Sequence, residues 1–179
     1  RVTGMLVAQI DALSSIASAF SDFARMPSTR IEPVEMIGLV REIVTLFDAP
    51  EEYQLRVSYP QQPFVFVSGD RDQLRRALVN IIRNATQAIQ NQENGAIHIR
   101  VELMNQKLAI AVCDNGPGIP ETDRERLFEP NFTTKSGGMG LGLAISKSIL
   151  ENYKGTISYQ SIKNETVFTL ELPLKEQDR

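Results

Sequence analysis

The first 26 residues carry apolar side chains at helical spacing and contain one glycine and no proline. Steps of four and three residues between them are typical of the seam of a coiled coil or helix bundle. The seam positions are Val2, Leu6, Gln9, Leu13, Ile16, Phe20 and Phe23. Pro27 ends this predicted helix, and residues 28–30 have the polar composition of a linker. The helix either folds back onto its own domain or pairs with another helix, and a narrow seam before a linker favours pairing.

After the linker, the spacing of apolar residues alternates between helical and strand-like stretches. The predicted helices cover residues 33–48, 70–90 and 141–153. Pro33 fits the start of the first of them, and Asp70 with Gln73 resembles a capping box at the start of the second. The predicted strands cover residues 54–59, 64–67, 97–103, 108–113, 156–161 and 166–172. Because the order lacks a strict strand–helix–strand rhythm, we expect an α+β fold, a two-layer α/β sandwich preceded by one long N-terminal helix.

Composition narrows the class of protein. The chain has 179 residues, 42% of them hydrophobic, and a formal net charge of −3, which fits one globular domain with an appendage. Mild acidity argues against nucleic acid as a partner, because such surfaces normally carry a basic stripe. No apolar run approaches the roughly 18 residues of a membrane helix, and no signal segment is present. Because the chain starts at Arg1 inside a patterned helix, we expect it to be a piece of a longer protein.

The single cysteine and the single histidine both lie in strand-like stretches. Cys113 ends an apolar run and is predicted to be a buried thiol rather than a nucleophile. A lone cysteine cannot form an internal disulfide, and a reducing, cytoplasmic setting is compatible with it. His98 is predicted to be a structural or surface residue of its strand.

Two asparagines at the edge of an apolar stripe form the first of four polar clusters. The stripe on helix 70–90 consists of Leu74, Leu78, Ile81, Ile82, Ala85 and Ile89. Asn80 and Asn84 are four residues apart and therefore share one helix face. Asparagine favours caps and turns over helix interiors, and Mg²⁺ sites often combine a few protein oxygens with phosphate oxygens. Taken alone, the pair is equally compatible with two surface amides that have no role.

The other three clusters lie between residues 114 and 144. The sequence DNGPGIP at 114–120 follows a strand directly; its glycines allow close approach of a ligand, and the Asp114 carboxylate can accept from an amine such as that of adenine. Residues 128–135 carry two aromatics and Lys135, a candidate phosphate contact. Residues 137–144 place glycines before a helix N-terminus, where backbone N–H groups favour an anion. Each of these clusters alone is also compatible with an ordinary turn or loop.

Together and in this order, the four clusters resemble the nucleotide-binding boxes of the GHKL superfamily, which unites gyrase-type ATPases, Hsp90, MutL and histidine kinases. NIIRNATQA is similar to the N box, DNGPGIP to the first glycine box, LFEPNFTTK to the F box and GGMGLGLAIS to the second glycine box. The residue sequences of these boxes resemble those of the histidine kinase branch, in particular those of sensor kinases of the nitrogen-regulation type. The resemblance covers residues 31–174 and implies that ATP lies between a helix layer and a flexible lid.

The resemblance also implies roles for individual residues. Asp114 would bind the adenine amino group, and Asn84, helped by Asn80, would hold Mg²⁺ bridging the phosphates. Residues 129–138 would form the lid, with Lys135 approaching the phosphates. The further positions assigned to the ATP site are Gln87, Gly116, Gly118, Ile119, Phe128, Phe132, Thr134, Gly138, Met139, Gly140, Leu141, Gly142 and Leu143.

The residue type at position 80 also distinguishes the branches of the superfamily. Its ATPases resemble one another in carrying a glutamate at this place as general base for water, and an amide cannot take that proton. We therefore expect a kinase that positions ATP for attack by a histidine, from which the phosphoryl group passes to a response-regulator aspartate. Residues 1–27 resemble the second helix of the dimerisation hairpin that bears this histidine, whereas the first helix is absent. Because His98 is not expected to be the phosphoacceptor, the chain alone is predicted to bind Mg-ATP without phosphorylating itself.

The expected organisation is an incomplete hairpin over 1–27, an ATP-binding catalytic domain over 31–174 and a tail over 175–179. Expected partners are the missing dimerisation helix, a second kinase chain and the receiver domain of a response regulator, without membrane contact by this chain. We expect a cytoplasmic domain whose parent is an inner-membrane sensor, and a monomer or weak dimer in isolation. The alternatives are a GHKL-type ATPase, a degenerate nucleotide-binding module, or a module used mainly for dimerisation.

Overall fold

The computed structural model describes residues 30–49, 51–90, 92–133, 139–162 and 164–175. The predicted N-terminal helix and most of the predicted tail therefore lie outside the described residues. The described elements are β1 (Glu32–Glu35), α2 (Met36–Thr45), β2 (Gln54–Ser58), β3 (Phe66–Gly69), α3 (Arg71–Ile89), β4 (Ala96–Met104), β5 (Lys107–Asp114), η1 (Glu121–Arg126), α4 (Gly142–Asn152), β6 (Thr156–Ile162) and β7 (Glu165–Pro173).

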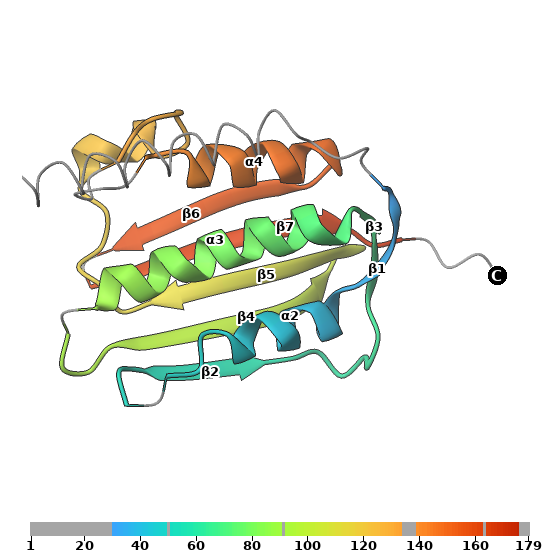
Figure 1. Ribbon diagram of the computed structural model, residues 1–179, viewed down its shortest axis with the longest axis horizontal. Helices are drawn as coiled ribbons and strands as arrows, with labels where there is room; N and C mark the ends of the chain where they lie inside the picture. The colour runs from blue at the N-terminus through green and yellow to red at the C-terminus, as the bar shows by residue number, and fades with distance from the viewer. Residues whose placement is uncertain (1–29, 50, 91, 134–138, 163, 176–179) are drawn as a thin grey trace, which may run out of the picture.

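Five strands form the main sheet in the spatial order β2-β4-β5-β7-β6 (Figure 1). β2 and β4 run parallel, and their connection passes through α3, whereas all other neighbours in this sheet are antiparallel. β1 and β3 form a separate antiparallel pair. Val67 of this pair also bridges Leu174, which ties the small sheet to the segment that follows β7. The sheet is therefore mixed, with a single parallel crossover.

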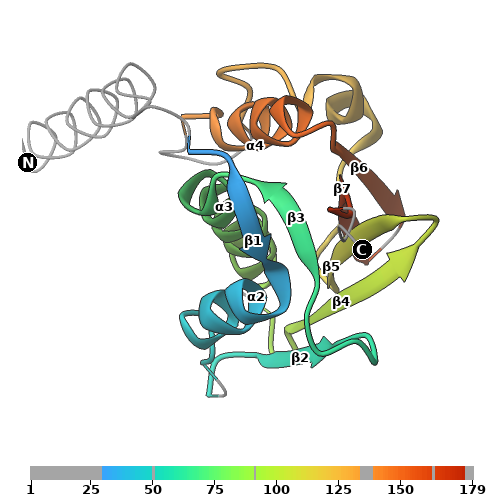
Figure 2. The same ribbon diagram turned by 90° about the vertical axis from the view of Figure 1, so that its right-hand side faces the viewer.

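The helices lie on one face of the main sheet, with α3 between α2 and α4 (Figure 2). This arrangement confirms the predicted two-layer α+β sandwich. The hydrophobic core fills the space between the layers, as expected for a sheet that buries one face against amphipathic helices. The predicted apolar stripe of α3 is buried throughout: Leu74, Leu78, Ile81, Ile82, Ala85 and Ile89.

The segment before α2 is a strand, although the sequence predicted the first turn of a helix there. Residues of β1 pair with β3, so the prediction that Pro33 starts the helix is wrong. The helix begins after Glu35, whose carboxylate accepts from the backbone N of Ile37 at 2.8 Å and of Gly38 at 2.6 Å. Glutamate is not one of the usual N-cap residues. The sequence pattern therefore gave no signal for the true start.

The remaining helices and strands lie within two residues of their predicted bounds. Asp70 caps α3 as predicted, because its carboxylate accepts from the backbone N of Asp72 and of Gln73. The polar region between β5 and α4 contains the short 3-10 helix η1, which the sequence did not predict. Its lack of any buried residue explains why no apolar periodicity marked it.

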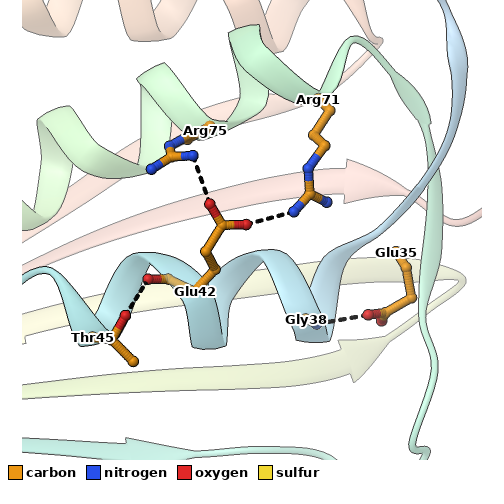
Figure 3. A network of polar contacts seen from close by, with 6 residues as sticks. All are labelled: Glu35, Gly38, Glu42, Thr45, Arg71 and Arg75. Atoms are coloured by element: carbon orange, nitrogen blue, oxygen red, sulfur yellow. Dashed lines mark hydrogen bonds and ion pairs between the residues drawn. The ribbon is translucent and has the colours of Figure 1, made fainter.

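A polar network joins the exposed sides of α2 and α3 (Figure 3). The Glu42 carboxylate pairs with Arg71 at 2.6 Å through one oxygen and with Arg75 at 2.6 Å through the other. Both arginines therefore have a protein counterion at the surface. Exposed pairs of this kind contribute little to stability, typically under about 1 kcal/mol each.

Cys113 and His98 are cross-strand neighbours, and the alternating burial along β4 and β5 places both on the sheet face away from the core. Alternation along β5 turns Val112 and Asp114 toward the core and Cys113 away from it. The thiol is therefore half-buried rather than buried as predicted, and burial raises its pKa. His98 Nε2 lies 3.1 Å from the hydroxyl of Ser58 on β2.

Candidate functional site

A cavity of about 570 Å³ lies between α3, the start of α4 and the segment after β5, a size typical of small-molecule sites. Many of the predicted site residues line it: Asn80, Asn84, Gln87, Asp114, Gly118, Ile119, Phe132, Met139, Gly140, Leu141, Gly142 and Leu143. Gly116 and Phe128 are not among the lining residues. Thr134, Lys135 and Gly138 lie outside the described residues.

Asp114 lines the cavity close to Ala88 of α3. It is the last residue of β5, is only 4% exposed, and lies directly opposite the equally buried Thr166 on β7. Its Oδ1 accepts from the backbone N of Gly116 at 2.9 Å. A Cβ on Gly116 would lie 2.6 Å from this oxygen and 3.0 Å from the Cβ of Ala88 on α3. Gly116 therefore fixes the carboxylate by close approach instead of lining the cavity.

The wall beside Asp114 is a loop that hydrogen bonds hold at both ends. Asn115 accepts from the backbone N of Ala96 at 2.8 Å, at the start of β4. Further along, the backbone N of Ile119 donates to Ser161 Oγ on β6 at 2.8 Å. The Arg124 guanidinium donates to the carbonyls of Ile119 at 3.3 Å and Ser161 at 3.1 Å. Arg124, which the sequence did not single out, thus attaches η1 and the cavity wall to β6.

Asn80 joins α3 to the start of α4. Its Nδ2 donates to Ser146 Oγ at 2.9 Å, and Ser146, which is 0% exposed, donates to the carbonyl of Gly142 at 3.0 Å. A Cβ on Gly142 would overlap the Asn80 side chain. The glycine at this position therefore allows α4 to begin directly against Asn80. Asn84, one turn further along α3, also lines the cavity.

The described helices α2, α3 and α4 differ in how their N-termini are satisfied. Carboxylates cap α2 and α3, through Glu35 and Asp70. α4 has no side-chain cap at Leu141 and no acidic residue in its first turn. Leu141, Gly142 and Leu143 all line the cavity. Free backbone N–H groups and the helix dipole together favour an anion at this point.

The aromatic residues of the third cluster take two different positions. Phe132 lines the cavity, and the Arg126 guanidinium stacks 4.6 Å from the centroid of its ring. Gly140, at φ +63°, packs against the backbone of Phe132, where a side chain would overlap it. Phe128 instead packs against Tyr159 of β6, with ring centroids 6.2 Å apart. It therefore anchors this segment on the sheet without lining the cavity.

Sequence reasoning missed several lining residues. Arg76 and Arg83 lie on the same stripe of α3 as Asn80, Asn84 and Gln87. Steps of four, three, one and three residues along this stripe are the periodicity of one helix face, so the arginines carried a signal that could have been used. Further lining residues that were not assigned are Val79, Ala88, Pro117, Pro120, Asp123, Leu127, Thr133, Ile145, Ser146, Thr166 and Phe168.

A match to a family model identifies the family of this chain. The model of the family "Histidine kinase-, DNA gyrase B-, and HSP90-like ATPase" matches residues 69–176. This chain belongs to that family. The match begins just before α3 and includes all four boxes, so the resemblance inferred from them is confirmed.

Curated relatives of this ATPase domain are sensor kinases. The C4-dicarboxylate transport sensor protein DctB of Rhizobium meliloti is 46% identical over 104 residues, 58% of this chain and 17% of its own length. The sensory histidine kinase/phosphatase NtrB of Vibrio alginolyticus is 34% identical over 151 residues, 78% of this chain and 42% of its own length. The chain therefore spans less than half the length of these relatives.

Solved structures give the same result for the fold. The catalytic domain of histidine kinase ThkA is 33% identical, with a TM-score of 0.69 over 80% of this chain and 95% of that chain. The structure of ThkA in complex with response regulator protein TrrA is 27% identical, with a TM-score of 0.78 over 98% of this chain and 51% of that chain.

In the part of this chain that the structure describes, no helix is both long and apolar enough to cross a membrane.

Proposed function

We propose that this ATPase-family domain binds Mg-ATP and positions the terminal phosphate for transfer to a histidine on another helix. The proposal rests on two different kinds of polar group that line separate parts of the cavity, an acceptor in one part and backbone donors in the other. A buried carboxylate, Asp114, lines the cavity close to Ala88 of α3, and the uncapped N-terminus of α4 lines it close to Asn80, about two helical turns earlier on α3. The first is an acceptor for a base amine, and the second is a group of donors for phosphate. The proposed unit is residues 31–174.

Adenine fits the Asp114 end for a specific reason. One carboxylate oxygen already accepts from Gly116 N, and a carboxylate carries further lone pairs that a base amine can use. Thr166 adds a hydroxyl beside it on β7. Ile119 and Phe168 contribute apolar surface to the cavity lining, as a purine ring requires.

Magnesium would depend on Asn84, assisted by Asn80, together with phosphate oxygens. Within the described ranges, no three His, Cys, Asp or Glu side chains gather closely enough to hold a metal ion. Amide oxygens suit Mg²⁺, which keeps few protein ligands and is commonly completed by substrate phosphates and water. A Mg²⁺ ion held there would supply positive charge that offsets the charge of the phosphates. The Asn80 amide nitrogen donates to Ser146, so its Oδ1 is the atom that would assist Asn84 at the metal.

Phosphoryl transfer to histidine, rather than ATP hydrolysis, is proposed because of Asn80. The cavity-lining residues of α3 are Arg76, Val79, Asn80, Arg83, Asn84, Gln87 and Ala88. None of these side chains is a carboxylate that can take a proton from water. Transfer to an external nucleophile requires mainly positioning and charge stabilisation, which this cavity can supply.

We infer the parent's partners from its relatives. The proposed nucleophile is a histidine on a dimerisation helix, with residues 1–27 as the second helix of that hairpin, and a second kinase chain completes the unit. The proposed final acceptor is a response-regulator aspartate, since one similar kinase has been solved in complex with its regulator. The proposed setting is the cytoplasmic part of a membrane sensor, and its relatives include a transport sensor protein and a sensory histidine kinase.

The test separates binding from transfer. The 179-residue chain is titrated with ATP in Mg²⁺ and in EDTA, and we expect binding that Mg²⁺ strengthens. Labelled ATP is then added to the chain alone and to the chain mixed with the histidine-bearing helix pair of its parent. We expect acid-labile, base-stable phosphate on the helix pair only.

Three results would contradict the proposal in different ways. Absence of ATP binding would remove the nucleotide site itself. Steady release of inorganic phosphate by the chain alone would favour a GHKL-type ATPase. Tight ATP binding without any transfer by the full-length parent would favour a non-catalytic nucleotide-binding module.

A further inference from the structure

The four arginines of α3 differ in whether the protein neutralises them. Arg71 and Arg75 pair with Glu42 on the flank that faces α2. Arg76 and Arg83 line the cavity, and within the described ranges neither side chain forms an ion pair or hydrogen bond. A cation that faces a cavity without a protein counterion favours an anionic ligand there.

The positions of Arg76 and Arg83 along α3 show which part of the cavity each of them lies beside. Ala88 marks the end beside Asp114, because it is the residue that a side chain on Gly116 would meet. Arg76 is twelve residues earlier, about 18 Å along the axis at 1.5 Å per residue. It lies one turn beyond Asn80, which contacts the start of α4.

Arg83 lies between these ends, one residue before Asn84. Helical side chains lean toward the N-terminus of their own helix, so its guanidinium reaches toward the turn of Asn80. An extended nucleoside triphosphate with its base at Asp114 would pass Arg83 first. Its last phosphate would come within reach of Arg76.

We propose that Arg76 binds the terminal phosphate of ATP and that Arg83 binds an inner phosphate. This inference rests on the proposed nucleotide site and assigns its phosphate contacts. Arg76 makes the site sensitive to the phosphate that is transferred, so it distinguishes ATP from ADP. Arg83 binds both nucleotides.

The test compares ATP and ADP affinities of the 179-residue chain carrying single substitutions, at fixed Mg²⁺. Arg76→Ala is expected to weaken ATP binding roughly tenfold to hundredfold and ADP binding less than about twofold, the range for a lost charged hydrogen bond. Arg83→Ala is expected to weaken both nucleotides alike. Arg71→Ala is the matched control on the same helix and is expected to change neither affinity. Raising the salt concentration is expected to reduce the ATP-to-ADP preference of the wild type more than that of Arg76→Ala.

Arg76→Lys keeps the positive charge, so it distinguishes the loss of charge in Arg76→Ala from a folding defect in that variant. It is expected to retain most of the ATP preference, with the thermal melt of each variant measured beside it. Unchanged ATP affinity in Arg76→Ala, or equal losses for ATP and ADP, overturns the assignment while wild-type ATP binding keeps the proposed function. Absence of ATP binding by the wild type overturns both.

Discussion

The two flanks of α3 face different neighbours and satisfy their polar groups differently. Toward α2, Arg71 and Arg75 are paired with Glu42, and Glu35 caps the N-terminus of α2. Toward α4, Asn80 reaches Ser146, and the N-terminus of α4 has no side-chain cap. On the first flank these charged groups and the helix N-terminus have protein partners, whereas on the second the helix N-terminus has no side-chain cap and lines a cavity.

This difference suggests where stability and where function reside in the domain. Polar groups that already have protein partners contribute to the fold, and their loss changes stability. Donors at a helix start that have no protein acceptor are available to an anion. Any effect of a substitution on the α2 flank should therefore be on unfolding, with nucleotide binding unchanged, whereas substitutions on the α4 flank should weaken nucleotide binding.

The largest effect is expected at Asp114. In Asp114→Asn, the remaining carbonyl oxygen can still accept from Gly116 N, but the other oxygen is replaced by an amide NH2 group, a donor that meets the amine of the base. We expect ATP affinity to fall by more than roughly a hundredfold, because two buried donors then face each other without an acceptor. Calorimetric titration measures the loss, and a urea melt is expected to show near wild-type stability. Retained ATP binding would place the base elsewhere in the cavity.

The next test compares two glycines in the first turns of helices on the two flanks, Gly142 of α4 and Gly38 of α2. Gly142→Ala puts a methyl group into the Asn80 side chain and separates α4 from α3, and overpacking of this kind costs about 1–3 kcal/mol. We expect about a tenfold or greater loss of ATP affinity, since the phosphate end of the cavity moves. Titration with ATP measures it.

Gly38→Ala on α2 is the matched control. Its methyl group would lie 2.7 Å from Glu35 Oε2, the end of a flexible side chain. A weakened cap and a gain in helix propensity are each worth about 1 kcal/mol with opposite signs. Stability therefore changes little and ATP affinity not at all. Equal losses of affinity in both variants would remove the distinction between the flanks.

A double-mutant cycle tests whether Asn80 only positions α4 or also assists Mg²⁺. Asn80→Ala and Ser146→Ala each remove the hydrogen bond between the two side chains. If Asn80 acts only by positioning α4, each single variant and the double variant lose ATP affinity by the same factor, with a coupling of about 1 kcal/mol. If Asn80 also assists Mg²⁺, the loss in Asn80→Ala is larger, and the excess disappears in EDTA. Additive losses would show that the hydrogen bond does not connect these two residues to the site.

The smallest effect is expected at Glu42. Glu42→Ala removes the counterion of Arg71 and Arg75, but all three side chains are well exposed. We expect the free energy of unfolding to fall by less than about 1 kcal/mol, and by less still at high salt. ATP affinity should equal that of the wild type. A reproducible change in affinity would mean that the α2 flank is coupled to the cavity.

Local sequence signals predicted most of the fold and much of the cavity lining. The apolar stripe of α3 and the cap at Asp70 were found because their periodicity and residue types are strong. The start of α2 was missed because Glu35 is an unusual cap that also accepts from the backbone N of Val65 on a distant segment. Arg76 and Arg83 were missed because arginines are common on exposed helix faces, and their helical spacing with Asn80 and Asn84 does not show that Arg71 and Arg75 are paired and they are not.

The sequence by itself determined the family, the layer arrangement and the nucleotide-binding boxes, because these depend on periodicity and on residues close together in the chain. Only the tertiary structure decided which polar groups are satisfied by the protein. Glu42 neutralises two arginines of α3 and leaves two others facing the cavity. Ser146, 66 residues away in sequence, engages the Asn80 amide. Such pairings depend on how helices distant in sequence pack on one sheet, and no local pattern encodes them.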